Sequence, residues 1–323
     1  MEQSMPSARR MSTRSVTIPG SSTKSTQGSD AASLHTTASE SNETIIEEDQ
    51  SMFFLEMNPL APVSVVLLHV LFSCHLEWKH VWPKLPEYHL LIPDLPCHSK
   101  SRRMCRKEDF TIGLCADLVA QLIREHAHDG RAHIVGLSLG GYIAMDLIIR
   151  HPDVVRDAMI VGAWPLKGRR LAVAQHPRLT YAGLWSVLHS PGSLFFKVSG
   201  YSGEYQYDEM LKEIKRNVSS RLAKSGFNQS GKWQEDMMVE VGKQDIKICM
   251  VAAGKQDDCD GVRIAAKIIK EQSKGGNGSQ TQAYAALDAI HAWNLQFPAV
   301  FAKGIQCWIE RQHMPKEYEN MPI

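Results

Sequence analysis

The chain has 323 residues, of which 43% are hydrophobic and 22% charged, and its formal net charge at pH 7 is +1. Such a length can bury a sizeable core, and so small a net charge gives no electrostatic argument for binding nucleic acid or an anionic membrane surface. No apolar run approaches the roughly 20 residues that a membrane-spanning helix needs. The composition is typical of a soluble globular protein.

The cysteines and the N-terminal segment carry predictions about the compartment. The seven cysteines are scattered and form no C-x-x-C pair, which favours reduced thiols inside the cell over a disulfide framework or a zinc site. Residues 1–50 are rich in Ser and Thr and poor in apolar residues, so we expect a disordered tail. Arginines near its start also fit a mitochondrial presequence, but the apolar face is weak and no secretory signal is present. The prediction is a cytoplasmic protein.

From residue 52 onward, strand and helix signals alternate along the chain. Strands are predicted at residues 52–55, 62–70, 89–92, 132–135, 157–162, 246–253 and 282–287. Helices are predicted at residues 78–85, 110–126, 142–150, 262–272 and 299–311. Continuous apolar strands that alternate with helices predict an α/β fold with a mostly parallel, doubly wound sheet.

The alternation lapses in the middle of the chain. Between residues 164 and about 244, only helical segments are indicated, at residues 171–174, 184–188 and 207–223. Helices inserted at this place in the β–α order predict a lid over the site, with an ordinary surface elaboration as the alternative. The expected organisation is a tail at 1–50, a core at 51–164, a lid at 165–244 and a second core part at 245–323.

The hexapeptide G-L-S-L-G-G at residues 136–141 places one serine between glycines at a predicted strand-to-helix junction. A strand that turns sharply into a helix leaves that serine strained and exposed, and a Cβ on the flanking residues would collide with the neighbouring elements. The G-x-S-x-G pattern in this context predicts a nucleophile at Ser138. The alternatives are a Gly-rich phosphate loop or a plain turn.

A serine hydroxyl attacks efficiently only when a base takes its proton and a carboxylate orients that base. In one known arrangement of these three groups, they follow along the chain in the order serine, acid, histidine. The acid then lies just beyond a later strand, and the histidine lies beyond the last strand. Asp257 follows the strand at 246–253, and Asp258 and Asp260 are close enough to compete with it. His291 follows the strand at 282–287 and precedes the closing helix.

Metal sites are not predicted. If the segment after the strand at 246–253 were a calcium loop with Gly261 at its sixth position, Lys267 would stand where the bidentate Glu belongs. His126, His128 and His133 straddle a helix end, a turn and a strand, which is a poor arrangement for a metal centre. We therefore expect neither a metal nor a cofactor.

With these parts in order, the chain resembles the α/β-hydrolase superfamily over roughly residues 52–312. The segments that carry the resemblance are His69, Glu77-Trp78, Asp94-Leu95-Pro96 with His98, the serine hexapeptide, Gly254-x-x-Asp257, and His291-Ala292-Trp293-Asn294. The resemblance implies that Ser138 is the nucleophile, His291 the general base and acid, and Asp257 its orienting group. Epoxide hydrolases and haloalkane dehalogenases of this superfamily carry aspartate at the nucleophile position. The resemblance therefore argues against both activities, and the serine at that position favours acyl chemistry.

Two departures from the family pattern affect the expected oxyanion hole and entrance. The family usually has His-Gly after the central strand, whereas this chain has His69-Val70. The expected oxyanion donors are then the backbone N–H groups of Leu71 and Leu139. If the missing glycine uses positive φ, valine there is strained by about 1–2 kcal/mol, and we hypothesise that it displaces the loop and weakens the hole. The second departure is Cys97, where the family has glycine.

The expected function is a serine hydrolase that cleaves a small to medium, apolar ester, lactone or thioester. A non-hydrolytic lyase, cyclase or acyltransferase, or a ligand-binding receptor on the same scaffold, is the alternative. The order of segments resembles fungal and bacterial hydrolases, some of which act in secondary metabolism. The expected partner is a small-molecule substrate, contacted by His69, Val70, Trp164 and Trp293.

Overall fold

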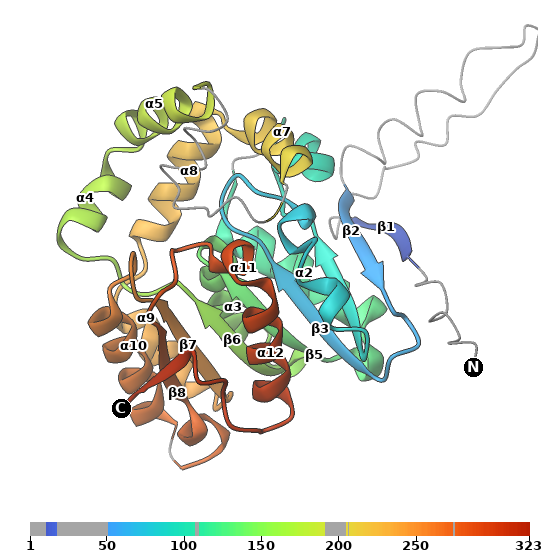
Figure 1. The fold of residues 1–323 in the computed structure, drawn as a ribbon, viewed down its shortest axis with the longest axis vertical. Coiled ribbons are helices and arrows are strands. Elements are labelled where there is room, and N and C mark those ends of the chain that lie inside the picture. Colours follow the sequence, from blue (N-terminus) through green and yellow to red (C-terminus); the bar gives the residue numbers. More distant parts are fainter. Residues whose placement is uncertain (1–10, 18–50, 107–109, 191–204, 206, 274) are drawn as a thin grey trace, which may run out of the picture.

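The computed structural model describes residues 11–17, 51–106, 110–190, 205, 207–273 and 275–323. Within these ranges, nine strands form one sheet in the order β1-β2-β4-β3-β5-β6-β7-β8-β9, with helices on both of its faces (Figure 1). The strands are β1 (Met11–Thr17), β2 (Ser51–Met57), β3 (Val63–Leu68), β4 (Tyr88–Pro93), β5 (Ala132–Leu137), β6 (Val155–Val161), β7 (Ile248–Ala253), β8 (Gln282–Ala286) and β9 (Tyr318–Met321).

The six central strands, β4-β3-β5-β6-β7-β8, are all parallel, and the edge strands β1, β2 and β9 run antiparallel to their neighbours. Strands β4 and β7 are buried at every residue. Continuous apolar sequence is therefore required in these strands, because helices cover both of their faces. The predicted fold class, a mostly parallel doubly wound sheet, is confirmed.

Two apolar clusters form the core, one on each face of the sheet. Alternate residues of β3 enter different clusters: Val66 and Leu68 pack with one, Val65 and Leu67 with the other. The first cluster is covered by α2 (Ile112–His126), α3 (Leu139–Arg150) and α10 (Cys259–Gln272), and the second by α12 (Pro298–Ile309). The carboxyl ends of the parallel strands meet at one edge between these layers, where ligands bind in open α/β sheets.

Further helices are inserted after β6. They are α4 (Gly168–Gln175), α5 (Pro177–Leu188), α7 (Asp208–Asn217), α8 (Ser220–Gly231) and α9 (Glu235–Lys243). Figure 1 shows α4, α5, α7 and α8 gathered beyond one end of the sheet, and we call these four helices the insertion. In contrast, α9 packs on α3 and α10, and its Met238 and Val241 are fully buried in the core. The predicted lid segment, 165–244, therefore includes one helix that belongs to the core layer.

The prediction of a disordered tail at 1–50 is wrong for residues 11–17. They form β1, which pairs with β2 in antiparallel register. Val16 is buried, and Arg14 lies 3.4 Å from the Glu56 carboxylate, so one apolar and one ionic contact fix this edge strand. The remaining residues of the tail lie outside the described ranges.

Two predicted helices are divided in the structure. The helix expected at 78–85 is replaced by two short 3₁₀ turns, η1 (His75–Trp78) and η2 (Trp82–Lys84), because Pro83 cannot continue an α-helix through this segment. The helix expected at 207–223 is divided into α7 and α8. Ser219 begins the second part, since its side chain accepts a 3.2 Å hydrogen bond from the backbone N–H of Leu222.

Within the described ranges, no helix is both long enough and apolar enough to cross a bilayer.

Candidate active site

Ser138 lies at the sharp turn between β5 and α3. Its backbone has φ 53° and ψ −112°, a conformation that non-glycine residues rarely adopt. The turn is close-packed, because a Cβ at Gly136 would collide with the carbonyl of Gly140, and one at Gly141 would lie 2.7 Å from the Cβ of Ala163. The flanking glycines thus allow strand and helix to approach while the serine occupies the strained position.

Asp257 lies in the turn after β7. Its side chain is fully buried, and its Oδ2 accepts a 2.8 Å hydrogen bond from the backbone N–H of Ala253. The other oxygen, Oδ1, is 2.6 Å from Nδ1 of His291. Because a carboxylate only accepts hydrogen bonds, Nδ1 is the donor, and Nε2 of the same ring is left as the basic nitrogen.

The two neighbouring aspartates, which the sequence left as alternatives, have other partners. Asp258 precedes α10 and caps it, accepting a 2.9 Å hydrogen bond from the backbone N–H of Gly261. Asp260 pairs with Arg263 at 3.3 Å on the exposed side of α10. Of the three carboxylates, Asp257 is the one that contacts His291.

His291 follows β8 and is fixed from its backbone as well as from its ring. Its N–H donates a 2.8 Å hydrogen bond to the side-chain oxygen of Gln256. Burial lowers the pKa of the imidazole, but the charge of Asp257 and its hydrogen bond outweigh burial, so the pKa is raised above its ordinary value. The ring is therefore a stronger base than an isolated histidine.

Gly162, which the sequence did not single out, makes room for this pair. Its φ is +62°, and a Cβ there would lie 2.8 Å from Cε1 of His291 and 3.2 Å from Oδ2 of Asp257. A glycine directly after the apolar strand β6 was the available signal. Its absent side chain lets the His291 ring lie against the end of that strand.

A cavity of about 360 Å³ lies between the sheet edge and the insertion. It is lined by Leu71, Ser138, Leu139, Tyr142, Gly162, Trp164, Leu166, Arg170, Val173, Ala174, Phe227, Ser230, Gln256 and His291. The volume is suited to a small or medium-sized ligand. Ser138 and His291 share this wall without a direct hydrogen bond between them in the described residues, and catalytic contacts in ligand-free sites are often this loose.

The segment after β3 forms the turn that holds one expected oxyanion donor. Ser73 donates its backbone N–H to the Val70 carbonyl at 3.1 Å, and Phe72 has φ +71°. Within the described residues, the N–H groups of Leu71 and Leu139 have no acceptor, and both residues line the cavity. Two uncommitted donors next to a serine are what an oxyanion hole requires.

Three buried side chains hold this turn, which we call the oxyanion turn (residues 70–73). Glu77 accepts from the backbone N–H of Val70 at 3.1 Å, and Nε2 of His98 accepts from that of Phe72 at 3.0 Å. Asn217, at the end of α7, donates its side-chain amide to the carbonyls of Phe72 and Ser73, both at 3.0 Å. The contacts of His98 and Asn217 leave no local signal in the sequence, because these residues lie 26 and 145 positions from Phe72.

Val70 does not occupy a strained position. The positive φ in this turn falls on Phe72, and Val70 is not among the residues with positive φ. Its side chain is half-buried and packs against the core. The backbone strain on which the hypothesis for Val70 rests is therefore absent, since the positive φ of the turn falls two residues later.

Of the four residues expected to contact substrate, Trp164 lines the cavity and the other three do not. His69 is fully buried, and its Nε2 accepts a 3.0 Å hydrogen bond from the backbone N–H of Leu95. Trp293 is fully buried and packs on Phe301. The structure thus leaves His69, Val70 and Trp293 out of the wall of this cavity, and their substrate contacts stay predictions.

The cysteine prediction also needs a correction. Cys97 and Cys105 are joined by a disulfide, whereas the other five cysteines, all within the described ranges, are free. Cys97 has φ +72°, which explains why glycine would suit this position. The turn at residues 99–106 brings the two Cα atoms to 5.1 Å, a proximity that their spacing in the sequence does not reveal.

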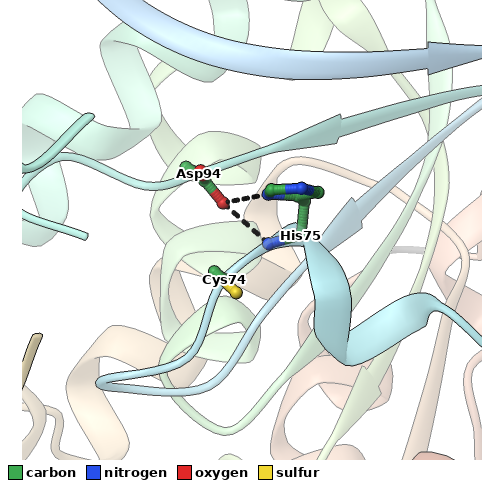
Figure 2. Close-up of side chains that lie close together, drawn as sticks. All are labelled: Cys74, His75 and Asp94. Atoms are coloured by element: carbon green, nitrogen blue, oxygen red, sulfur yellow. Dashed lines mark hydrogen bonds and ion pairs between the residues drawn. The ribbon is translucent and has the colours of Figure 1, made fainter. Parts of the chain in front are cut away.

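One group of donors could in principle hold a metal. Cys74, His75 and Asp94 lie close together, with one ligand atom of each within 4.8 Å of the others (Figure 2). Oδ1 of Asp94 already accepts hydrogen bonds from the backbone N–H and from Nδ1 of His75, at 2.7 and 2.8 Å. Burial raises the pKa of the Cys74 thiol, which disfavours the thiolate that a metal needs. We assign this group to the hydrogen bonding that holds the loop after β3.

The fold and the serine turn define the class of protein. A strained serine between a central parallel strand and its helix, with a histidine and an acid on later strand ends, is the arrangement of α/β-hydrolases. The family model of the alpha/beta hydrolase fold matches residues 63–245, and the chain belongs to this family.

Comparison with known proteins gives relatives of similar length. An AB hydrolase superfamily protein of Gibberella zeae is 29% identical over 279 residues, covering 85% of this chain and 89% of the relative. A thermophilic esterase of Thermogutta terrifontis has a TM-score of 0.61 at 17% identity, covering 81% of this chain and 94% of the esterase. The N-acyl homoserine lactonase AidH has a TM-score of 0.58 at 20% identity, covering 80% and 93%. At these identities, the likeness to the two solved structures shows a shared fold alone.

Proposed function

We propose that this chain is a serine hydrolase that cleaves a small to medium, largely apolar ester, lactone or thioester. The observation that carries the proposal is the 2.6 Å contact between His291 and the buried Asp257, on the wall of a cavity that also contains Ser138. The names of the structural neighbours, an esterase and a lactonase, support the same reaction class. A cytoplasmic location and a role in secondary metabolism stay predictions.

The chemistry follows from the positions of these groups. The Ser138 oxygen attacks the substrate carbonyl carbon while Nε2 of His291 takes the hydroxyl proton, and the resulting oxyanion accepts from the N–H groups of Leu71 and Leu139. Collapse of this intermediate breaks the bond to the leaving group, which takes the proton from His291. Water then attacks the acyl-serine with the same proton transfers, releasing the acid and restoring the serine.

The direct test is covalent labelling with a fluorophosphonate, followed by intact-mass measurement. The wild-type protein should gain the mass of one phosphonyl group, and the Ser138→Ala variant should not. Turnover of an activated ester should fall about 10⁵–10⁶-fold in that variant. Equal labelling of both proteins, or none of the wild type, would overturn the proposal.

Oxygen-labelled water separates hydrolysis from lyase, cyclase or transferase chemistry. A hydrolase incorporates one labelled oxygen into the acid that it releases, because water attacks the acyl-serine. Turnover without incorporation would assign the site to a non-hydrolytic reaction.

A further inference from the structure

Arg170, on helix α4 of the insertion, has an unusual place in the cavity wall. Most of the lining is apolar, contributed by Leu71, Leu139, Trp164, Leu166, Val173, Ala174 and Phe227. Among the described lining residues, the Arg170 guanidinium is the only group that is always charged. An apolar cavity with one cation is matched by a ligand with an apolar body and one anionic group.

The guanidinium is held in place without a counter-ion. Its carbon lies 5.2 Å from the centre of the Trp164 ring, a distance suited to a cation–π contact. One of its N–H groups donates to the backbone carbonyl of Gln256, the residue before Asp257. No carboxylate among the described residues forms an ion pair with Arg170. A planar group with five donors therefore keeps most of them for other acceptors.

Arg170 also lies close to the N-terminal end of helix α4. This helix has no acidic residue in its first turn, and Lys167, at its N-terminal boundary, pairs with Glu235 at 2.6 Å. Arg170 lies in that first turn, where the helix dipole disfavours a cation and favours an anion. A bound anion would be stabilised by both the arginine and the helix end.

We propose that Arg170 binds an anionic group of the substrate, a carboxylate in the simplest case. The substrate class is then a monoanionic ester, lactone or thioester whose apolar part fills the cavity beside Ser138. This inference rests on the proposed function, because it concerns the same cavity. The guanidinium suits a carboxylate because its paired N–H groups can bind both oxygens at once.

Arg170 could instead only connect the insertion to the core through Gln256. The two roles differ in how substrate charge affects the loss of activity. A connecting role predicts that replacement of Arg170 lowers turnover of neutral and anionic substrates equally. A binding role predicts a loss confined to the anionic substrate, expressed mainly in KM.

The test compares kcat and KM for ester pairs that differ only in charge. In one pair the carboxylate is on the acyl side, para-nitrophenyl hydrogen glutarate against para-nitrophenyl pentanoate. In the other it is on the alkoxy side, 4-carboxyphenyl butyrate against phenyl butyrate. The wild type should prefer the anionic member of at least one pair, and Arg170→Gln should lower kcat/KM for that member by about 10- to 100-fold with little change for its neutral partner.

Arg169→Gln is the matched control, since Arg169 is the neighbouring exposed residue and does not line the cavity. It should leave both pairs unchanged, and Arg170→Lys should keep part of the anionic preference. Fluorophosphonate labelling of Arg170→Gln should be retained, which separates failure of this proposal from failure of the hydrolase itself. No anionic preference in either pair, or an equal loss for both members, would overturn the role of Arg170.

Discussion

The two sides of the cavity are built differently. On the sheet side, each reactive group follows its own strand, and backbone contacts fix it: Ser138 donates its N–H to the Val161 carbonyl at 2.8 Å, and Asp257 accepts from Ala253. On the insertion side, the helices are only partly covered, and α4 and α5 expose large apolar residues such as Val173 and Trp185. If the proposed function holds, the reacting groups thus belong to the well-buried sheet side, and part of the substrate contacts belong to the less buried insertion.

This difference predicts that mutations on the two sides of the cavity affect different kinetic constants. Changes on the sheet side should lower kcat, because they move the atoms that react. Changes on the insertion side should act mainly on KM, since they alter ligand contacts. Asn217 is the exception, because it extends from α7 to the oxyanion turn on the sheet side.

After the loss already expected for Ser138→Ala, the largest effect is expected at Asp257. Asp257→Asn removes the charge that selects the His291 tautomer, so kcat should fall by about 10⁴-fold while KM stays near its original value. Steady-state kinetics on a para-nitrophenyl ester measures both constants. A loss of less than about tenfold would contradict the assignment of this aspartate.

The pH profile of the same variant provides a second readout. In the wild type, kcat/KM should rise with pH through an apparent pKa above the ordinary histidine value of 6.5, because Asp257 raises the pKa of His291 against burial. In Asp257→Asn, the burial that lowers the pKa of His291 remains while the charge that raises it is lost. The rise of kcat/KM should therefore occur at lower pH than in the wild type. Glu77, whose pKa burial raises to about 7, titrates in the same window, so the shift between the two proteins is the quantity to compare.

Gly162→Ala should lower kcat by about 10²-fold, since the new Cβ would lie 2.8 Å from Cε1 of His291 and displace the ring. Gly168→Ala is the control, because Gly168 also has positive φ, at +53°, but has no atom within 4 Å of the added Cβ. Both variants should lose about 1–2 kcal/mol of stability in thermal unfolding from the left-handed backbone. Equal activity in the two would show that the ring tolerates the contact.

Asn217→Ala should lower kcat by about tenfold, which is less than the loss of an oxyanion donor, because Glu77 and His98 still hold the turn. KM for a neutral ester should change little, since Asn217 does not line the cavity. Asn228→Ala, on the exposed side of α8, serves as the control and should be neutral. A change in KM without a change in kcat would show that Asn217 acts through substrate contacts of the insertion and not through the oxyanion turn.

The smallest effect is expected at Val70. Val70→Gly should leave kcat on an activated ester within about twofold, because the strained residue of the turn is Phe72. Stability should fall by about 1 kcal/mol from lost packing and added chain freedom, as measured in urea. A large rise in kcat would contradict this prediction and support the hypothesis that Val70 strains the turn.

Sequence predicts the sheet side of the site better than the insertion side, for a physical reason. Buried parallel strands need continuous apolar residues, and a strand-to-helix turn at a serine needs glycines, so both leave a local pattern. Ser138, Asp257 and His291 follow such strands, and their order along the chain brings them to one edge. Local pattern is therefore enough to nominate these three residues.

Contacts between distant segments leave no such pattern. Asn217 is 145 residues from Phe72, and nothing near either residue indicates their hydrogen bond. Strand β1 leaves no local signal either, because the strand that it pairs with begins 34 residues after its last residue, with Thr17 opposite Ser51. The closeness of Trp293 to His291 in the sequence predicts a substrate contact, but the Trp293 side chain, two residues after the histidine, is buried in the core.

Asn217 also begins an Asn-Val-Ser sequence, the acceptor pattern for N-linked sugars. Its side-chain nitrogen is buried and committed to Phe72, Ser73 and Ser99 in the folded chain. A sugar attached there during secretion would occupy that nitrogen before the turn could form, so glycosylation and folding compete for one atom. Recombinant production through a secretory route would therefore trap chains without a formed oxyanion turn, whereas synthesis in a bacterial cytosol avoids this competition.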